Sequence, residues 1–193
     1  RRQRQMCIRD RVDPRTQASK IGFVQQNPDN QIVTDKVWHE LAFGLESLGY
    51  DRATIRGRVA EMASFFGIQA WFYRDVASLS GGQKQLLNLA SVMVTQPKAL
   101  ILDEPSSNLD PEAEHRLFEE LRKLTAGKTV LFTSHRLSNV SLADRIVVLE
   151  HGVVLEDGTR EALLQQRGRF AELFQYQKEH FETQAEKGEG ALS

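Results

Sequence analysis

The alternation of hydrophobic and polar positions predicts strands and helices in turn along most of the chain. Residues 99–103 form an apolar run ending in Asp103, which is typical of a parallel strand buried on both faces. Asp110 as a cap and Pro111 at the first helical position predict a helix over 111–124. We expect further strands at 20–25, 129–134, 145–150 and 153–156, and a further helix at 83–95. Such alternation indicates an α/β fold with a mostly parallel sheet.

The segment from Asp35 to about Val76 has a different pattern, because its apolar residues recur at helical spacing. Two amphipathic stretches are separated by Gly49, and Gly67 ends the second. Glycine is the usual residue just beyond a helix end. We therefore expect at least two consecutive helices between the first strand and the helix at 83–95.

Composition narrows the class of protein. The 193 residues are 40% hydrophobic and 26% charged, which is typical of a globular domain. The net charge of −1 leaves no basic surplus, so we expect no nucleic-acid partner. The apolar runs are strand-length, far short of the ~20 residues that a spanning helix needs, so membrane work would require a separate membrane protein. A single cysteine, Cys7, excludes an internal disulfide and suits a reducing compartment.

Acidic residues end the strand at 99–103, at the sheet edge where open α/β folds bind ligands. In a nucleotide-hydrolysing enzyme, Asp103 would hold Mg²⁺ and Glu104 would orient or deprotonate the attacking water. Taken alone, such a pair is more often a solvated strand end. His135 follows the strand at 129–134; a lone histidine there is more often a capping residue, but it could also touch a γ-phosphate.

The segment Ser80-Gly81-Gly82-Gln83 precedes the helix at 83–95. Ser80 can act as N-cap, and the glycines allow backbone amides to approach a ligand closely. A helix N-terminus favours anions because its N–H groups are free and its dipole end is positive. A simple loop-to-helix turn would use the same residues.

Taken together, these segments resemble the ATP-binding cassette (ABC) family in order and spacing. The resemblance covers roughly residues 20–176 and includes the signature motif at 79–83, the Walker B strand at 100–105, the D-loop at 107–110 and the switch histidine. It implies a P-loop NTPase-like fold with an inserted helical subdomain at about 35–78. It implies ATP and Mg²⁺ as cofactors and these site residues: catalytic Glu104, His135 and Gln26; ATP-binding Ser80, Gly81, Gly82, Gln83, Ser107 and Asp110; metal-binding Asp103 and Gln26.

The resemblance also implies an assembly. Two cassettes would face each other head to tail, docked on transmembrane transporter subunits at the cytoplasmic face of the membrane. Transport of an unidentified substrate would be driven by ATP hydrolysis. Residues 23–31 and 42–45 look like energy-coupling factor and cobalt-type importer ATPases, whereas 133–138 and 143–159 look like exporter cassettes. The substrate and the direction of transport are therefore not assigned by the sequence.

One family element is missing, since the phosphate-binding loop Gly-x-x-x-x-Gly-Lys-Ser/Thr occurs nowhere in the sequence. Together with the start on Arg1, this leads us to expect an N-terminally truncated chain that begins after that loop and after the first strands. Residues 1–19 would then be irregular and not necessarily native, and 177–193 would be a charged tail. The chain alone should be inactive, with an exposed hydrophobic flank where the missing strands would pack.

Two other functions stay open at this stage. A soluble ABC-type ATPase of DNA repair or translation usually carries long coiled coils or basic arms, and neither occurs here. A non-catalytic fragment that only binds a partner is compatible with the missing loop, although Glu104 and His135 favour hydrolysis in the parent protein. We expect the membrane partner to dock between Gln26 and the 35–76 helices, on aromatic and apolar residues from Trp38, Leu41 and Tyr50 or from Trp71-Phe72-Tyr73. The alternative is that these residues simply pack the core of the helical subdomain, and their solvent accessibility distinguishes the two.

Overall fold

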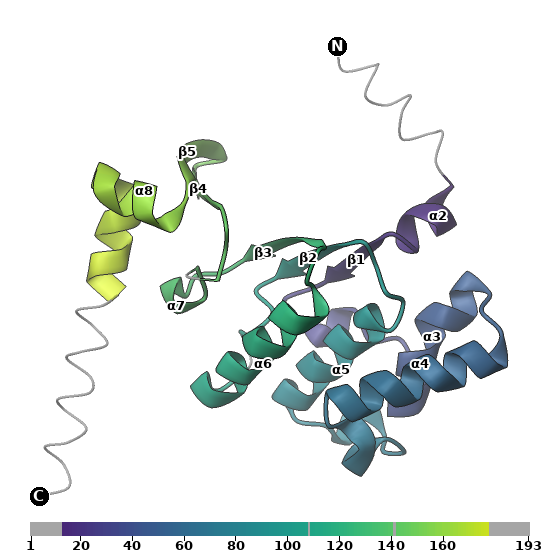
Figure 1. Ribbon diagram of the computed structural model, residues 1–193. Coiled ribbons are helices and arrows are strands. Elements are labelled where there is room, and N and C mark those ends of the chain that lie inside the picture. The colour runs from purple at the N-terminus through teal and green to yellow at the C-terminus, as the bar shows by residue number, and fades with distance from the viewer. Residues whose placement is uncertain (1–12, 108, 141, 178–193) are drawn as a thin grey trace, which may run out of the picture. The chain divides into compact units, whose positions relative to one another are not determined.

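The computed structural model describes residues 13–107, 109–140 and 142–177, which fall into two compact units that meet in sequence at Thr133/Ser134. The first unit contains a parallel sheet in the order β1–β2–β3, formed by Ile21–Val24, Ala99–Asp103 and Thr129–Thr133 (Figure 1). β2 and β3 pair in parallel, in agreement with the predicted mostly parallel sheet. β2 is the central strand of this sheet, and β3 is an outer strand.

Helices pack against one side of this sheet. α5 (Gly81–Met93) lies against β1, and α6 (Pro111–Leu124) reaches β3 through Phe118 and Phe132, whose ring centroids are 5.8 Å apart. On this side Val24, Leu100 and Leu102 are almost completely buried. The predicted bounds of the strand 99–103 and the helix 111–124 match β2 and α6 at both ends, because Asp110 and Pro111 define the start of α6.

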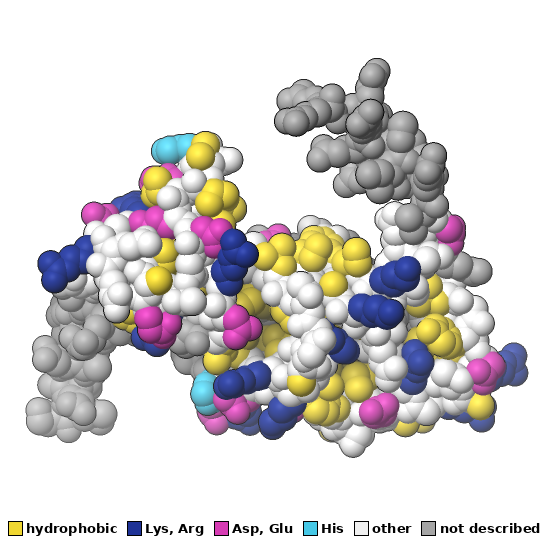
Figure 2. Space-filling model, turned by 45° about the horizontal axis from the view of Figure 1, so that its top comes forward, with side chains coloured by type: hydrophobic (Ala, Val, Ile, Leu, Met, Phe, Trp, Pro, Cys, Tyr) yellow, Lys and Arg dark blue, Asp and Glu magenta, His cyan; other side chains and the backbone are white. Residues whose placement is uncertain are grey.

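The other side of the sheet is open. Ile21, Phe23, Ile101 and Leu131 are exposed by 48%, 46%, 37% and 61%, and hydrophobic side chains gather on the surface shown in Figure 2. The prediction that the run 99–103 is buried on both faces is wrong for these described residues, since its helices cover one side only. The expected exposed hydrophobic flank is confirmed.

The predicted consecutive helices are α3 (Val37–Leu48) and α4 (Arg52–Phe65). Gly49 and Gly67 follow them in the left-handed conformation, with φ of 81° and 65°, as the pattern predicted. Asp51 caps α4 by accepting the N–H groups of Ala53 and Thr54. Short 3₁₀ turns, η2 (Ile68–Trp71) and η3 (Val76–Ser78), lead toward α5, and η1 (Pro28–Asn30) and α2 (Pro14–Ala18) flank β1.

The residues expected to form the docking surface are only partly exposed in the structure. Trp38, Tyr50 and Tyr73 are exposed, but Leu41 and Trp71 belong to the core of the first unit. The expectation that Leu41 and Trp71 offer docking surface is therefore wrong. Leu41 lies on the inward side of α3, and Trp71 ends a 3₁₀ turn that packs into the same core.

The second unit is built on a hairpin of β4 (Ile146–Glu150) and β5 (Val153–Gly158). His151 and Gly152 make the predicted turn, both with positive φ, as a tight hairpin turn requires. In the described residues these strands form an antiparallel two-stranded sheet of their own. α7 (Leu137–Val140), α8 (Arg160–Gln166) and a helical stretch at 169–177 complete the unit, around a small core of Ile146, Leu163 and Phe170.

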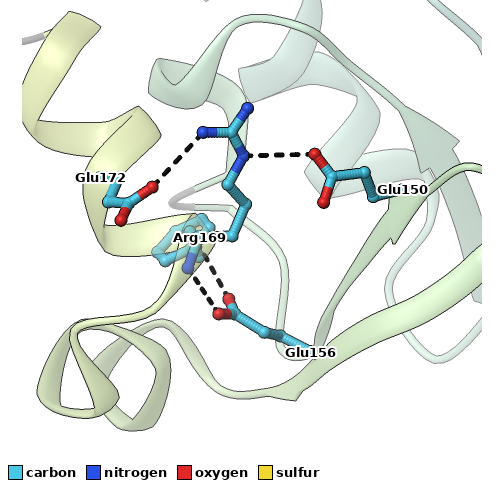
Figure 3. A network of polar contacts seen from close by, with 5 residues as sticks. Glu150, Glu156, Arg169 and Glu172 are labelled. Atoms are coloured by element: carbon cyan, nitrogen blue, oxygen red, sulfur yellow. Dashed lines mark hydrogen bonds and ion pairs between the residues drawn. The ribbon is translucent and has the colours of Figure 1, made fainter.

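A carboxylate on the hairpin caps the last helical stretch of this unit. Glu156 accepts the backbone N–H groups of Arg169 at 2.6 Å and Phe170 at 3.0 Å (Figure 3). The Arg169 guanidinium lies between the carboxylates of Glu150, at 3.6 Å, and Glu172, at 3.3 Å. A charged acceptor at a helix N-terminus satisfies free donors and complements the helix dipole, so Glu156 joins the hairpin to this helix.

Candidate functional site at the sheet edge

The carboxyl ends of the three parallel strands bring predicted site residues together. Gln26 follows β1 by two residues, Asp103 ends β2, and Glu104 comes next in the chain. The side-chain amide of Gln26 donates from Nε2 to Glu104 Oε2 at 2.7 Å, although 78 positions separate the two residues in sequence. The strand order explains this contact, because β1 and β2 are adjacent and parallel.

Thr133 completes this edge, although no motif in the sequence identifies it as a site residue. Its hydroxyl donates to Asp103 Oδ1 at 2.7 Å and accepts the backbone N–H of Glu104 at 3.0 Å. Thr133 is paired with Asp103 in the β2–β3 register, so the two side chains lie on the same face. Glu104 itself has a positive φ of 43°, which is uncommon for a residue other than glycine.

The donor set at this edge fits a magnesium ion. Thr133 engages one carboxylate oxygen of Asp103 and leaves Oδ2 for an ion, and the amide oxygen of Gln26 is a second hard ligand. Mg²⁺ prefers oxygen and usually keeps several waters, so one or two protein ligands are sufficient. Within the described ranges no group of three or more His, Cys, Asp or Glu side chains could hold a metal alone. The residues therefore suit a Mg²⁺ that is shared with a phosphate ligand.

The signature segment starts α5 through a complete capping box. The Ser80 hydroxyl accepts the N–H of Gln83 at 3.3 Å, and the Gln83 side chain accepts the N–H of Ser80 at 3.0 Å. Gly81 and Gly82 form the first turn, at the positive end of a 13-residue helix. The capping role predicted for Ser80 is confirmed. The binding roles of these four residues remain a prediction.

Ser107 and Asp110 follow the carboxylates within the first unit. The Ser107 N–H donates to the Glu104 carbonyl at 3.1 Å, and Asp110 caps α6 by accepting the N–H of Ala113 at 2.8 Å. His135 belongs to the second unit, where its backbone carbonyl accepts the side-chain amide of Gln177 at 2.8 Å. The contact of His135 with a γ-phosphate therefore stays a prediction.

Gln31 connects the segment that carries Gln26 to α5. Its Oε1 accepts the N–H of Gln25 at 2.8 Å and the side-chain amide of Asn88 at 3.1 Å. Asn88 is fully buried on α5, the helix that the signature segment starts. One side chain thus holds the residue before Gln26 and the signature helix together.

The chain is similar to several known proteins. A family model described as "AAA domain, putative AbiEii toxin, Type IV TA system" matches residues 42–140. The energy-coupling factor transporter ATP-binding protein EcfA1 of Ligilactobacillus salivarius is 40% identical over 146 residues, covering 75% of this chain and 52% of that protein. A "Putative ABC transporter ATP-binding protein" of Bacillus thuringiensis subsp. konkukian is 44% identical over 150 residues, covering 76% and 27%.

Two solved structures are also similar to this chain. CbiO1 of Clostridium perfringens, described as part of the ABC transporter complex CbiONQ, superposes with a TM-score of 0.69 at 30% identity, covering 77% of this chain and 61% of that one. The chain belongs to the family of AAA-type P-loop domains, and its relatives include ABC transporter ATP-binding proteins. A bacterial Atm1-family ABC exporter with ATP bound also matches this chain, with a TM-score of 0.68 at 27% identity and covering 83% and 29%.

These matches confirm the predicted family and fold class. They include both an energy-coupling factor transporter ATP-binding protein and an exporter, the two kinds of protein that the sequence resembles. The chain spans from about a quarter to about half of the length of the curated relatives cited here. In the part of the chain that the structure describes, no helix is long and apolar enough to cross a membrane.

Proposed function

We propose that this chain is part of the ATPase subunit of an ABC transporter and that Glu104 orients the attacking water during ATP hydrolysis. The observation that carries the proposal is the meeting of Gln26, Asp103 and Glu104 at one sheet edge, with Gln26 bonded to Glu104 at 2.7 Å. Asp103 and Gln26 would hold Mg²⁺, which when bound neutralises charge on the phosphates. His135 would touch the γ-phosphate.

The substitution Glu104→Gln tests this assignment in a protein in which the chain is preceded by a phosphate-binding loop. The change keeps the shape of the side chain and removes its basic carboxylate. We expect ATP binding to persist and kcat to fall by about 10²–10⁴-fold, the usual cost of losing a general base. Glu112→Gln, on the exposed surface of α6, is the matched control and should hydrolyse ATP at the normal rate. Equal turnover in the Glu104→Gln variant and the control would assign Glu104 a structural role.

The signature segment would act on a second cassette. Ser80, Gly81, Gly82 and Gln83 would close on the nucleotide of a partner subunit, together with Ser107 and Asp110, in a head-to-tail dimer. The 193-residue chain alone should then show no ATPase activity, because its sequence contains no phosphate-binding loop to cradle its own nucleotide. Mg²⁺-dependent hydrolysis by the purified chain that Glu104→Gln abolishes would contradict this expectation.

The membrane partner would dock beside β1 and α3, at the cytoplasmic face of the membrane. A pocket of about 220 Å³ lies there, lined by Val33 and Phe43 and also by polar side chains such as Gln31 and Glu40. It adjoins the turn that carries Gln26, so a docked transmembrane subunit would contact the segment leading to the hydrolytic site. Exposed apolar surface of this kind is typical of a protein interface.

Co-sedimentation with membranes that contain the transmembrane subunits tests the docking proposal. Phe43→Asp should abolish binding, because it replaces an exposed apolar side chain of the proposed contact with a charge. Val153→Asp, on an exposed position of the second unit, is the control and should bind normally. Normal binding by Phe43→Asp would place the membrane contact elsewhere.

A further inference from the structure

Thr133 is the side chain at the sheet edge that touches both acidic residues. A threonine hydroxyl has one proton to donate and two lone pairs that accept. The proton is used toward Asp103 Oδ1 at 2.7 Å, and one lone pair accepts the N–H of Glu104 at 3.0 Å. A single hydroxyl therefore fixes the side chain of one carboxylate and the backbone of the other.

The backbone at Glu104 needs such a partner. Its φ of 43° lies in the left-handed region, which residues other than glycine rarely adopt. Pro105 follows it, and a residue before proline is normally pushed toward an extended conformation with φ near about −120°. Conformations of this kind persist only where the surroundings hold them. Here Glu104 is held on both sides, because its N–H donates to Thr133 and its carbonyl accepts the N–H of Ser107 at 3.1 Å.

This turn decides where the carboxylate of Glu104 lies. The left-handed conformation directs the chain away from the strand direction immediately after Asp103, and the Glu104 carboxylate meets the amide of Gln26 at 2.7 Å. Asp103 remains in the strand register opposite Thr133. Two adjacent residues of the same charge are thereby directed to different partners.

We propose that Thr133 is a positioning residue for hydrolysis, whose hydroxyl fixes the Asp103 carboxylate for Mg²⁺ and holds the left-handed turn that directs Glu104 toward the attacking water. The inference rests on the proposed function, because it takes the roles of Asp103 and Glu104 from it. Threonine suits the task because its branched Cβ restricts χ1, which keeps the hydroxyl in one direction on the strand.

The first test measures the hold on Glu104 directly in the 193-residue chain. Thr133→Val keeps the shape and removes the hydroxyl, Thr133→Ser keeps the hydroxyl, and Thr129→Val makes the same change at the exposed opposite end of β3. Amide hydrogen exchange at Glu104, followed by NMR, should be about five- to tenfold faster in Thr133→Val, the effect of one lost hydrogen bond. Thr133→Ser and Thr129→Val should exchange at the unsubstituted rate. An unchanged rate in Thr133→Val, or an equal rise in Thr129→Val, would overturn the proposal.

The second test measures the hold on Asp103 with Mn²⁺ as the probe for Mg²⁺, in a protein in which a phosphate-binding loop precedes the chain and with ATP present, by the electron paramagnetic resonance signal of the ion that is not bound to the protein. Groups that orient a metal ligand typically contribute about 10–100-fold to metal affinity, so Thr133→Val should weaken Mn²⁺ binding at least tenfold. Thr133→Ser should restore it, which loss of packing alone would not explain. If Asp103→Asn weakens binding and Thr133→Val does not, the proposal is wrong.

The same titration separates this inference from the proposed function. If Asp103→Asn leaves Mn²⁺ binding unchanged, the metal assignment of Asp103 in the proposed function fails. The exchange rate of the Glu104 amide still decides whether Thr133 holds the turn, because that measurement needs neither metal nor nucleotide.

Discussion

Replacing Gly22 with alanine tests how closely β1 packs on the helix behind it. A Cβ atom at Gly22 would lie 2.5 Å from Val92 Cγ1, 2.8 Å from Leu100 Cδ2 and 3.0 Å from Pro97 Cγ. Carbon atoms in favourable contact are about 3.5–4.0 Å apart, so the new methyl group overlaps its neighbours by about 0.5–1 Å. Val92 is stiff at χ1, and Leu100 is almost fully buried, so neither can withdraw easily.

The expected cost of Gly22→Ala is about 1–3 kcal/mol of unfolding free energy, as for other overpacked cores. Gly57→Ala is the matched control, because a Cβ at this position in α4 meets nothing within 4 Å. There the better helix propensity of alanine should raise stability by about 0.5–1 kcal/mol. The same chemical change should therefore have opposite signs at the two glycines.

Urea unfolding followed by tryptophan fluorescence measures both variants, since Trp38 and Trp71 lie in the first unit. The midpoint should fall for Gly22→Ala and rise for Gly57→Ala. A displaced β1 should also weaken the 2.7 Å bond from Gln26 to Glu104, because Gln26 follows the same strand. If Gly22→Ala is as stable as the unsubstituted chain while Gly57→Ala behaves as expected, the packing behind β1 is looser than these distances indicate.

Two further predictions concern the second unit. Gly168→Ala should speed amide exchange at Phe170 by about 5–30-fold, because the new Cβ would displace the Glu156 carboxylate that caps the helical stretch at 169–177. The effects of Gly168→Ala and Glu156→Ala on this exchange rate should not add in the double variant, and additive effects would contradict the capping role. The hydrogen bond from Arg145 holds the pKa of Asp157 below its ordinary 3.8. The stability that this pair contributes is therefore fully present above pH 3.8 and is lost as the pH falls through the lowered pKa of Asp157. NMR titration of the Asp157 carboxyl should show a midpoint below 3.8 that returns toward 3.8 in Arg145→Gln; an unshifted midpoint in both would contradict the pairing.

Much of the first unit could be predicted from sequence because its signals are local. Asp110 and Pro111 define the start of α6, and the apolar run ending in Asp103 gives β2 at both bounds. The meeting of Gln26 with Glu104 also follows from a simple rule, since parallel strands present their carboxyl ends at one edge.

The remaining features depend on register and on tertiary packing, which a single sequence does not reveal. Thr133 reaches Asp103 because β2 and β3 pair with these two residues opposite each other. The run Trp71-Phe72-Tyr73 shows no periodicity that would identify its buried member, and the structure buries Trp71 and exposes Tyr73. The bond from Asn88 to Gln31 joins residues 57 positions apart, and Asn88 belongs to none of the motifs that the sequence shows.

Because Gln31 is bonded to both α5 and Gln25, the helix and the turn after β1 should move together. The bond from Asn88 to Gln31 is 3.1 Å long, and a hydrogen bond is lost beyond about 3.5 Å. If α5 slides by more than about half an ångström, the bond therefore survives only when Gln31 moves with the helix. One helical turn earlier, Lys84 is bound to Asp29 at 2.6 Å, and this second attachment resists rotation about the first. A displacement of the first turn of α5 should therefore also move the backbone of Gln25, the residue next to Gln26.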